Sequence, residues 1–186
     1  MTLLYVLLGI IALLVIWFIA SYNGFIRLVN RAKEAWADID VQLKRRYDLI
    51  PNLVNTVKGY AAHEKDTFEN ISTARSAAMG ATGLGDKAHA ENMLTGALGK
   101  LFAVAEAYPE LKANENFLSL QTELSDTENK IQAARRFYNT NVRDLNTRIE
   151  SFPGNVIADM FHIAKMEFFQ LNETDAAARE PVEVKF

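Results

Sequence analysis

Hydrophobic side chains cover every face of the first twenty residues and only one face of the residues that follow. No charged side chain occurs before Arg27. From Phe25 to Tyr47, apolar residues recur at alternating spacings of four and three, the period of a helix buried along one face. No proline occurs before Pro51. This pattern predicts one helix over about residues 3–48, lipid-facing in its first half and packed against protein in its second.

The apolar start of the chain has two interpretations, a cleaved signal peptide or a retained membrane span. A signal peptide begins with basic residues, whereas Met1 and Thr2 are the only residues ahead of this apolar run. The run is also about as long as a bilayer requires. We therefore expect a transmembrane anchor over residues 1–22. Its representative membrane-spanning positions are Leu3, Leu8, Leu13, Trp17 and Ala20.

Basic residues follow the predicted span and none precedes it. Arg27, Arg31 and Lys33 come shortly after it. The positive-inside tendency then predicts an N-terminus outside and a helical domain in the cytoplasm. Arg27 and Arg31 are also the juxtamembrane basic residues best placed to meet lipid phosphates.

Three further helices are expected before residue 152. Asp48 and Pro51 suit the start of a second helix, which ends at the glycine-rich residues 80–85. We interpret that stretch as a turn, because its spacing does not match a phosphate-binding loop. A third helix runs from Asp86 towards Pro109, and a fourth, over about residues 113–151, keeps a coiled-coil period. Short connections predict an antiparallel up-down-up-down four-helix bundle over residues 23–152.

Residues 153–171 are expected to form a short amphipathic C-terminal helix near the membrane, because the fourth helix should return there. Three roles remain open for it: a core helix over the end of the bundle, a helix in the lipid interface, or a face for another subunit. Few basic residues occur in this segment, which favours protein contact over lipid. The candidate interaction residues here are Phe161, Phe168 and Phe169.

The tail, residues 172–186, is polar until residues 181–186, which alternate apolar and charged side chains. This β-like alternation suits an edge strand added to a partner, or a C-terminus captured in a pocket; a frayed tail is the simpler alternative. Its candidate interaction residues are Val182, Val184 and Phe186.

Composition and motifs argue against an enzymatic or metal-binding function. The net charge is −3, which gives no reason to expect nucleic acid as a partner, and the chain has no cysteine. His63, His89 and His162 are scattered, and no helical zinc, nucleophile-elbow or di-iron motif occurs. We expect no catalytic residue, no cofactor, no metal site and no enzymatic activity. The basic run at residues 44–46 is expected to be a solvated, salt-bridged face.

Several segments together resemble the LemA family. They are AWADIDVQLKRRYDLIPNLV at 35–54, TVKGYAAHE at 56–64, ARS at 74–76, YNTNVR at 138–143, ESFPGN at 150–155 and PVEVKF at 181–186. The resemblance implies a bacterial protein of the inner membrane, with one N-terminal transmembrane helix and an antiparallel helical bundle. It supplies no catalytic residues and no cofactor.

Two functions suit this organisation. The first is a membrane-anchored structural or scaffold protein that forms a homo-oligomer through its bundle and C-terminal segment. Residues 27–46 hold six basic and three acidic residues, whereas residues 167–186 hold five acidic and two basic ones, which favours contact between the two. The alternative is a tethered adaptor that presents its bundle tip or tail to another membrane protein, such as a protease. The expected partners are the lipid bilayer and either a second copy or that membrane protein.

Overall fold

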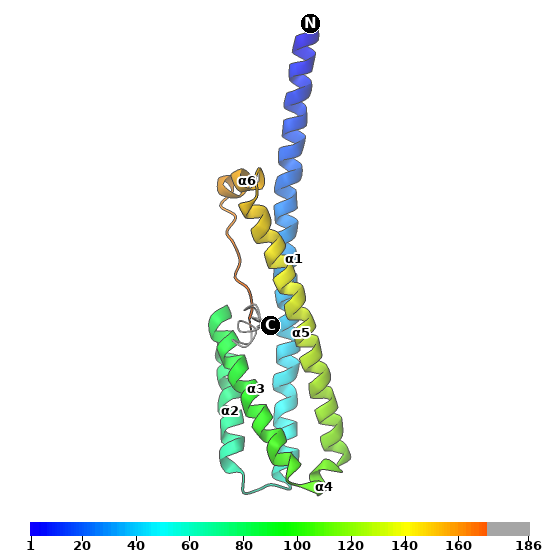
Figure 1. Cartoon of the computed structure of the whole chain (residues 1–186), viewed down its shortest axis with the longest axis vertical. Helices are drawn as coiled ribbons and strands as arrows, with labels where there is room; N and C mark the ends of the chain where they lie inside the picture. The colour runs from blue at the N-terminus through cyan, green and yellow to red at the C-terminus, as the bar shows by residue number, and fades with distance from the viewer. Residues whose placement is uncertain (171–186) are drawn as a thin grey trace, which may run out of the picture. The chain divides into compact units, whose positions relative to one another are not determined.

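The computed structural model describes residues 1–170, and every regular element within them is a helix, as the sequence predicts. Val182, Val184 and Phe186 lie outside the described residues. The six helices, labelled in Figure 1, are α1 (Thr2–Lys58), α2 (Lys65–Gly80), α3 (Leu84–Glu106), α4 (Pro109–Lys112), α5 (Glu115–Glu150) and α6 (Gly154–Met160).

The chain divides into two compact units. Unit 1 comprises residues 1–39 and 134–168, and unit 2 comprises residues 40–133 and the residues from 169 onward. Helices α1 and α5 each contribute one part to unit 1 and another to unit 2. Each unit is described below by itself.

Helix α1 is longer than predicted and does not end near Asp48. It continues through Pro51 to Lys58, so the predicted second helix is wrong over its first part. A proline inside a helix has no N–H for the carbonyl four residues earlier, here that of Tyr47. Arg75 of α2 donates its Nε–H to that carbonyl at 2.7 Å. The Tyr47 carbonyl therefore receives a hydrogen bond from α2 in place of the one that proline cannot donate, which reduces the destabilisation caused by Pro51.

The predicted buried faces of α1 and α5 are confirmed. The α1 stripe from Phe25 to Tyr47 contains no exposed residue. The coiled-coil positions of α5 contain none either: they are Phe117, Leu120, Leu124, Thr127, Ile131, Ala134, Tyr138, Asn141, Leu145 and Ile149. Helix α5 begins where Asn114 accepts a hydrogen bond from the backbone N–H of Phe117 at 3.0 Å, an N-terminal cap. Periodicity therefore identified the buried faces even where it misplaced a helix end.

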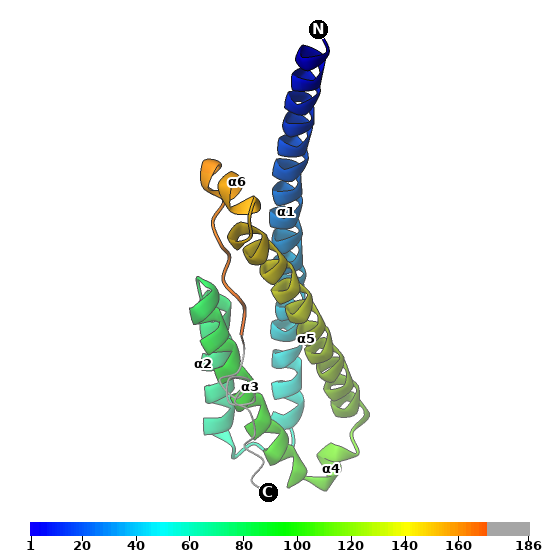
Figure 2. The same ribbon diagram turned by 45° about the horizontal axis from the view of Figure 1, so that its top comes forward.

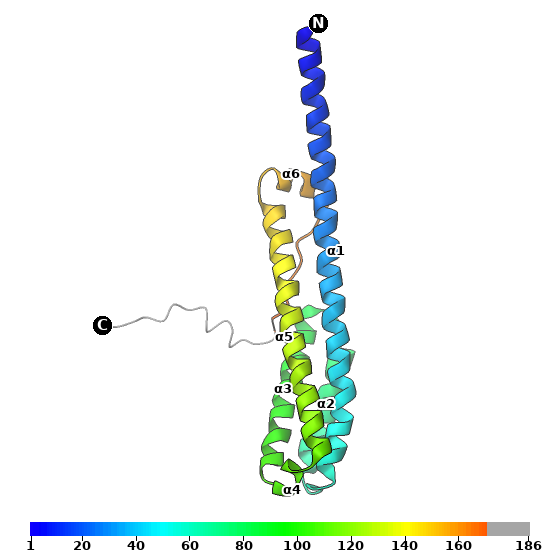
Figure 3. The same ribbon diagram turned by 90° about the vertical axis from the view of Figure 1, so that its right-hand side faces the viewer.

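Helices α2 and α3 of unit 2 lie side by side and are joined by residues 81–83 (Figure 3). Gly83 in this turn has a φ of 93°, a conformation that favours glycine. The glycine-rich stretch is thus an inter-helix turn, as expected.

The segment after α5 departs most from prediction. Helix α6 ends at Met160, so the amphipathic helix expected to residue 171 is wrong beyond that point. His162 adopts a φ of 52°, and residues 163–170 are not helical. Residues 163–168, here called the strap, leave α6 in unit 1 (Figure 2). Side chains of α5 bond the strap backbone, as described below, and replace the hydrogen bonds that a longer helix would have made.

Candidate functional site

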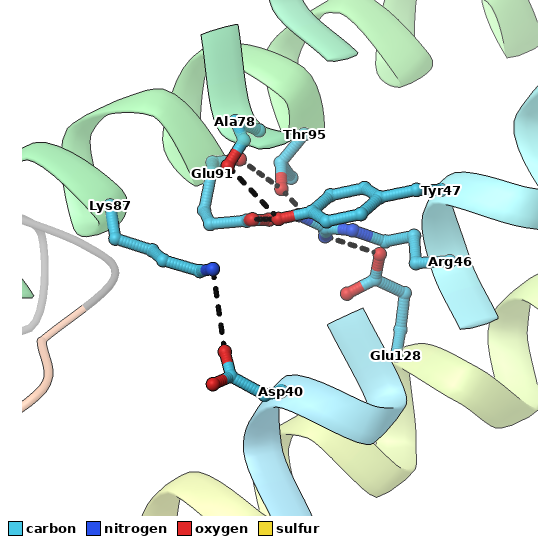
Figure 4. A network of polar contacts seen from close by, with 8 residues as sticks. All are labelled: Asp40, Arg46, Tyr47, Ala78, Lys87, Glu91, Thr95 and Glu128. Carbon is cyan, nitrogen blue, oxygen red and sulfur yellow. Dashed lines mark hydrogen bonds and ion pairs between the residues drawn. The ribbon is translucent and has the colours of Figure 1, made fainter. Parts of the chain in front are cut away.

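Unit 2 contains a buried polar network centred on Arg46 of α1 and Glu91 of α3 (Figure 4). The two side chains form an ion pair, with exposed fractions of 1% and 0%. Arg46 Nη1 also donates to Glu128 Oε1 of α5 at 2.6 Å and lies 3.4 Å from Thr95 Oγ1. One guanidinium therefore connects three helices.

Tyr47 extends the network towards α2. Its hydroxyl donates to Glu91 and lies 3.4 Å from the carbonyl oxygen of Ala78. Burial raises the pKa of Tyr47 to about 12, with a further increase from the Asp40 carboxylate and an opposing effect from Arg46. Asp40 in turn pairs with Lys87 of α3 at 3.3 Å. At neutral pH the phenol stays protonated and acts as a hydrogen-bond donor.

This arrangement fixes helix packing better than it supports a reaction. Removing a carboxylate and a guanidinium from water costs several kcal/mol each, which only good mutual geometry offsets. Both Glu91 oxygens have donors, from Arg46 and Tyr47, and Arg46 has Glu128 as a second acceptor. Within residues 1–170, no group of three or more metal-binding side chains comes together.

The prediction of a solvated basic face is wrong for Arg46, although Lys44 and Arg45 are exposed as expected. A signal was present in the sequence. Arg46 follows buried Leu43 by three positions and precedes buried Ile50 by four, so it occupies a buried helix position. Glu91 stands likewise three positions before buried Leu94. Opposite charges on two buried stripes could have predicted a buried pair.

A second candidate site lies in unit 1, where α6 and the C-terminal end of α5 meet α1. Ile157 and Ala158 of α6 are buried against Phe25 of α1 and Leu145 of α5. The approach is close, because a methyl group on Gly154 would clash with the backbone carbonyl of Arg148. The sequence Ser-Phe-Pro-Gly after α5 thus folds α6 back onto the helix that precedes it.

Arg148 ties the end of α5 to α1. Its Nη2 lies 3.3 Å from the carbonyl oxygen of Ser21 and 3.4 Å from the Ser21 hydroxyl, and its guanidinium lies 4.9 Å from the centre of the Phe25 ring. Gly24 leaves room for it, since a methyl group there would come within 2.5 Å of Arg148 Nη1. A depression of about 210 Å³ lies beside it, between Trp17 and Ser21 of α1 and residues 151–154.

Two neutral side chains of α5 bond the strap backbone, and Lys165 of the strap also forms an exposed ion pair with Glu150 of α5 at 2.5 Å. Asn146 donates from Nδ2 to the carbonyl of Met166 at 2.9 Å and accepts from the Met166 N–H at 3.0 Å. The Tyr138 hydroxyl donates to the carbonyl of Glu167 at 3.0 Å. Burial raises the pKa of Tyr138, and the Glu167 charge adds to the effect. The strap is therefore fixed by its backbone, and its side chains Ile163 and Met166 also pack against the core of unit 1.

The predicted interaction residues separate in the structure. The ring of Phe161 packs against Phe18 and Tyr22 of α1, with centroids 5.9 and 4.5 Å away. Phe168 on the strap is 44% exposed, whereas Phe169 is fully buried and cannot meet a partner as it stands.

The predicted membrane positions share one environment. The five representative span positions are exposed, and so are Arg27 and Arg31, whereas Phe18 and Tyr22 are half-buried and Ser21 is buried. The span positions are Leu3, Leu8, Leu13, Trp17 and Ala20.

Comparison with known proteins finds several related sequences. The magnetosome protein MamQ of Magnetospirillum gryphiswaldense is 25% identical over 174 residues, which are 80% of this chain and 64% of that protein. The chain thus spans less than two thirds of that relative's length. Magnetosome protein MamQ 2 of Paramagnetospirillum magneticum is 27% identical, over 88% of this chain and 71% of its own length.

A third relative is named for the family itself. Protein LemA of Metamycoplasma hominis is 27% identical over 162 residues, which cover 85% of this chain and 73% of that protein. The profile of the LemA family matches residues 35–186, from the middle of α1 to the last residue. Since this match covers most of the chain, the protein belongs to the LemA family.

Proposed function

We propose that this protein is a non-enzymatic, membrane-anchored structural protein whose copies associate in the bacterial cytoplasmic membrane. The observation that carries the proposal is the N-terminal part of α1. Its most apolar window is long enough to cross a bilayer, and none of it is buried within the protein. The same helix continues without interruption into the packed part of unit 1.

The magnitude of this exposure argues for lipid. Burying one leucine or isoleucine side chain is worth about 1.5–3 kcal/mol, so the exposed leucine, isoleucine and valine side chains of residues 3–19 represent a large unmet stabilisation in water. A core helix of a soluble protein would bury these side chains against its own chain. Because the anchor and the packed helix are one element, the membrane would hold unit 1 without a flexible linker.

The helical domain of the proposal is an antiparallel four-helix bundle on the cytoplasmic side. The network of Arg46, Glu91 and Glu128 supports it, because the buried Arg46 of α1 forms one ion pair with α3 and another with α5. The bond from Arg75 to the Tyr47 carbonyl adds α2. A polar network of this kind favours one helix register over others.

Association between copies would use the strap. Phe168 is an exposed aromatic ring on a segment that Asn146 and Tyr138 hold in place, so little ordering would be needed on binding. The acidic residues 167–186 could then meet the basic residues 27–46 of a second copy. Arg46 is already paired in the core and takes no part in that contact.

Mass photometry of the full-length protein in mild detergent tests association. We expect oligomers at micromolar protein, and a shift towards monomer in Phe168→Ser. Leu118→Ser is the matched control, because Leu118 is an equally exposed apolar residue, but on α5 in unit 2. A strictly monomeric wild-type protein would overturn self-association.

The orientation has its own test. The chain has no cysteine, so a single Met93→Cys substitution on α3 gives one labelling site. We expect a membrane-impermeant maleimide to label it only after the inner membrane is opened. Labelling in intact cells with a permeable outer membrane would place the domain on the other side.

A second candidate function, a tethered adaptor, has one observation in its favour. A depression of about 520 Å³ at the C-terminal end of α1 is lined by Lys58, Lys65 and Phe68 among others, with the Lys58 ammonium 5.4 Å from the Phe68 ring centre. Although Glu69 also lines the depression, two cations beside an aromatic ring suit an acidic peptide. Pull-downs with Lys65→Glu and with a chain ending before Pro181 would show whether this surface or the tail selects partners.

A further inference from the structure

We propose that the outer face of α6 and the turn before it lies in the headgroup region of the bilayer that α1 spans. This α6 face consists of Phe152, Val156, Met160 and Phe161. The inference rests on the proposed membrane span and adds a second point of lipid contact, which would fix the tilt and rotation of unit 1 at the membrane surface.

The first argument is that α6 carries apolar side chains on two sides, with Asp159 as its exposed charged residue. Ile157 and Ala158 fill the core of unit 1, as described above. Val156 and Met160, four positions apart, share the opposite side and are 51% and 57% exposed. Phe152 in the preceding turn is 83% exposed. The inner side accounts for the position of α6, whereas Phe152, Val156 and Met160 on the outer side stay exposed and Phe161 joins that side to α1.

The second argument is that this face continues the surface of the span. Phe161 contacts both Phe18 and Tyr22 of α1, and Phe152 lines the same depression as Trp17. The exposed apolar surface therefore passes from α1 onto α6 through the aromatic contacts of Phe161, while Arg148 lines the depression between Trp17 and Phe152. An environment that covers Trp17 and Phe18 must extend to Phe161.

The depth of the face follows from helix geometry. Twenty residues at about 1.5 Å each span about 30 Å, the thickness of the hydrocarbon core, so residues 18–22 lie near its boundary. The first charged side chain, Arg27, stands about 7 Å beyond Tyr22. The α6 face thus lies between the hydrocarbon and the first basic residue, where aromatic side chains are enriched.

Charge and size favour lipid over a second copy. Arg148 is half-buried and lines the depression at the level of Ser21, where a lipid phosphate would be found. A stable protein interface needs about 20–30 residues on each side. Four apolar side chains around a seven-residue helix fall far short of that, whereas they suffice for shallow insertion beside an existing anchor.

The test uses single cysteines in the full-length protein, each labelled with an environment-sensitive NBD dye. Phe152→Cys and Val156→Cys report on the α6 face, and Leu13→Cys reports on the span. Met93→Cys is the matched aqueous control, because Met93 is as exposed as Val156 but lies in unit 2. The protein is placed in vesicles of phosphatidylcholine and phosphatidylglycerol, with or without a phosphatidylcholine that carries a doxyl quencher high on its acyl chain.

We expect emission at shorter wavelength and loss of intensity with the doxyl lipid at positions 152, 156 and 13, and neither effect at 93. Quenching at 13 but not at 152 and 156 would overturn the inference and leave the anchor intact. Short-wavelength emission at 152 and 156 without quenching would indicate a protein partner and would also overturn it. Absence of quenching at 13 would overturn the proposed span, and the inference with it.

Discussion

The two units satisfy their buried polar groups in different ways. Unit 2 buries full charges, with Arg46 and Glu91 paired at its centre and a tyrosine hydroxyl on the same carboxylate. Unit 1 has an apolar core around Phe25 and uses neutral groups, the Asn146 amide and the Tyr138 hydroxyl, to bond a strap of backbone. Buried charges thus join helices in unit 2, whereas in unit 1 neutral groups bond the strap backbone and the Lys165–Glu150 pair is exposed.

This difference predicts how each unit responds when a buried polar group loses its partner. A buried charge that loses its partner is expensive, because the remaining ion stays in a poorly solvated place. A surface strap that loses an amide can expose its backbone to water at lower cost. Unit 2 should therefore be sensitive to single substitutions of polar residues, whereas unit 1 should release its strap locally.

The largest effect is expected from Glu91→Leu. It leaves the Arg46 guanidinium buried without its main partner, at a cost of about 3–5 kcal/mol in the free energy of unfolding. Thermal unfolding followed by circular dichroism, with hydrogen exchange in α3, would measure it. The control Lys87→Leu breaks only the outer pair with Asp40 and should cost about 0–1 kcal/mol. The double variant Arg46→Met/Glu91→Leu should recover most of the lost stability. Equal losses in Glu91→Leu and Lys87→Leu would show that the buried Arg46–Glu91 pair is no more important than the outer pair.

Alkaline pH should destabilise unit 2 next most strongly. The pKa of Tyr47 rises from 10.0 to about 12 on folding, so between these values the unfolded chain has released a proton that the folded chain retains. The contribution of Tyr47 to the free energy of unfolding is then fully present below pH 10. It falls by at most about 1.4 kcal/mol per pH unit until about pH 12. Tyr47→Phe should show a shallower decline in urea unfolding over this range. An unchanged slope would mean that Tyr47 titrates alike in both states.

Asn146→Leu should release the strap in unit 1. It removes both bonds to Met166, and we expect a loss of about 2 kcal/mol, since the freed backbone groups can be hydrated in part. Hydrogen exchange at the Met166 amide should become faster, while α3 in unit 2 keeps its protection. Arg143→Ala, at an exposed position of the same helix, should leave the Met166 amide unchanged. Protection at Met166 that survived Asn146→Leu would show that the amide does not hold the strap.

The smallest effect concerns the proline of α1. Arg75→Ala should cost about 1.5 kcal/mol, because the Tyr47 carbonyl loses a charged donor. In the background of Pro51→Ala the helix supplies an N–H of its own, so the same substitution should cost less. A double-mutant cycle measures the difference as a coupling free energy of about 1 kcal/mol. A coupling near zero would mean that Arg75 acts independently of the proline.

Sequence alone was sufficient for features that repeat locally. The buried stripe from Phe25 to Tyr47 and the stripe of α5 follow from helical periodicity, because each position depends only on residues three or four away. The apolar start of α1 and the turn at Gly83 belong to the same class. Family membership likewise resides in contiguous segments, and the match over residues 35–186 bears out the resemblance.

Tertiary structure decided where polar groups find partners. Arg46 and Glu91 are 45 residues apart, and Arg75 reaches the Tyr47 carbonyl across 28 residues, so no local pattern contains either pair. The same reason explains why α1 passes Pro51 and why α6 stops at Met160, where Asn146 and Tyr138 compete for the backbone that follows. Apolar burial depends on spacing along one helix, whereas satisfying a charge or a carbonyl depends on what another segment brings to it.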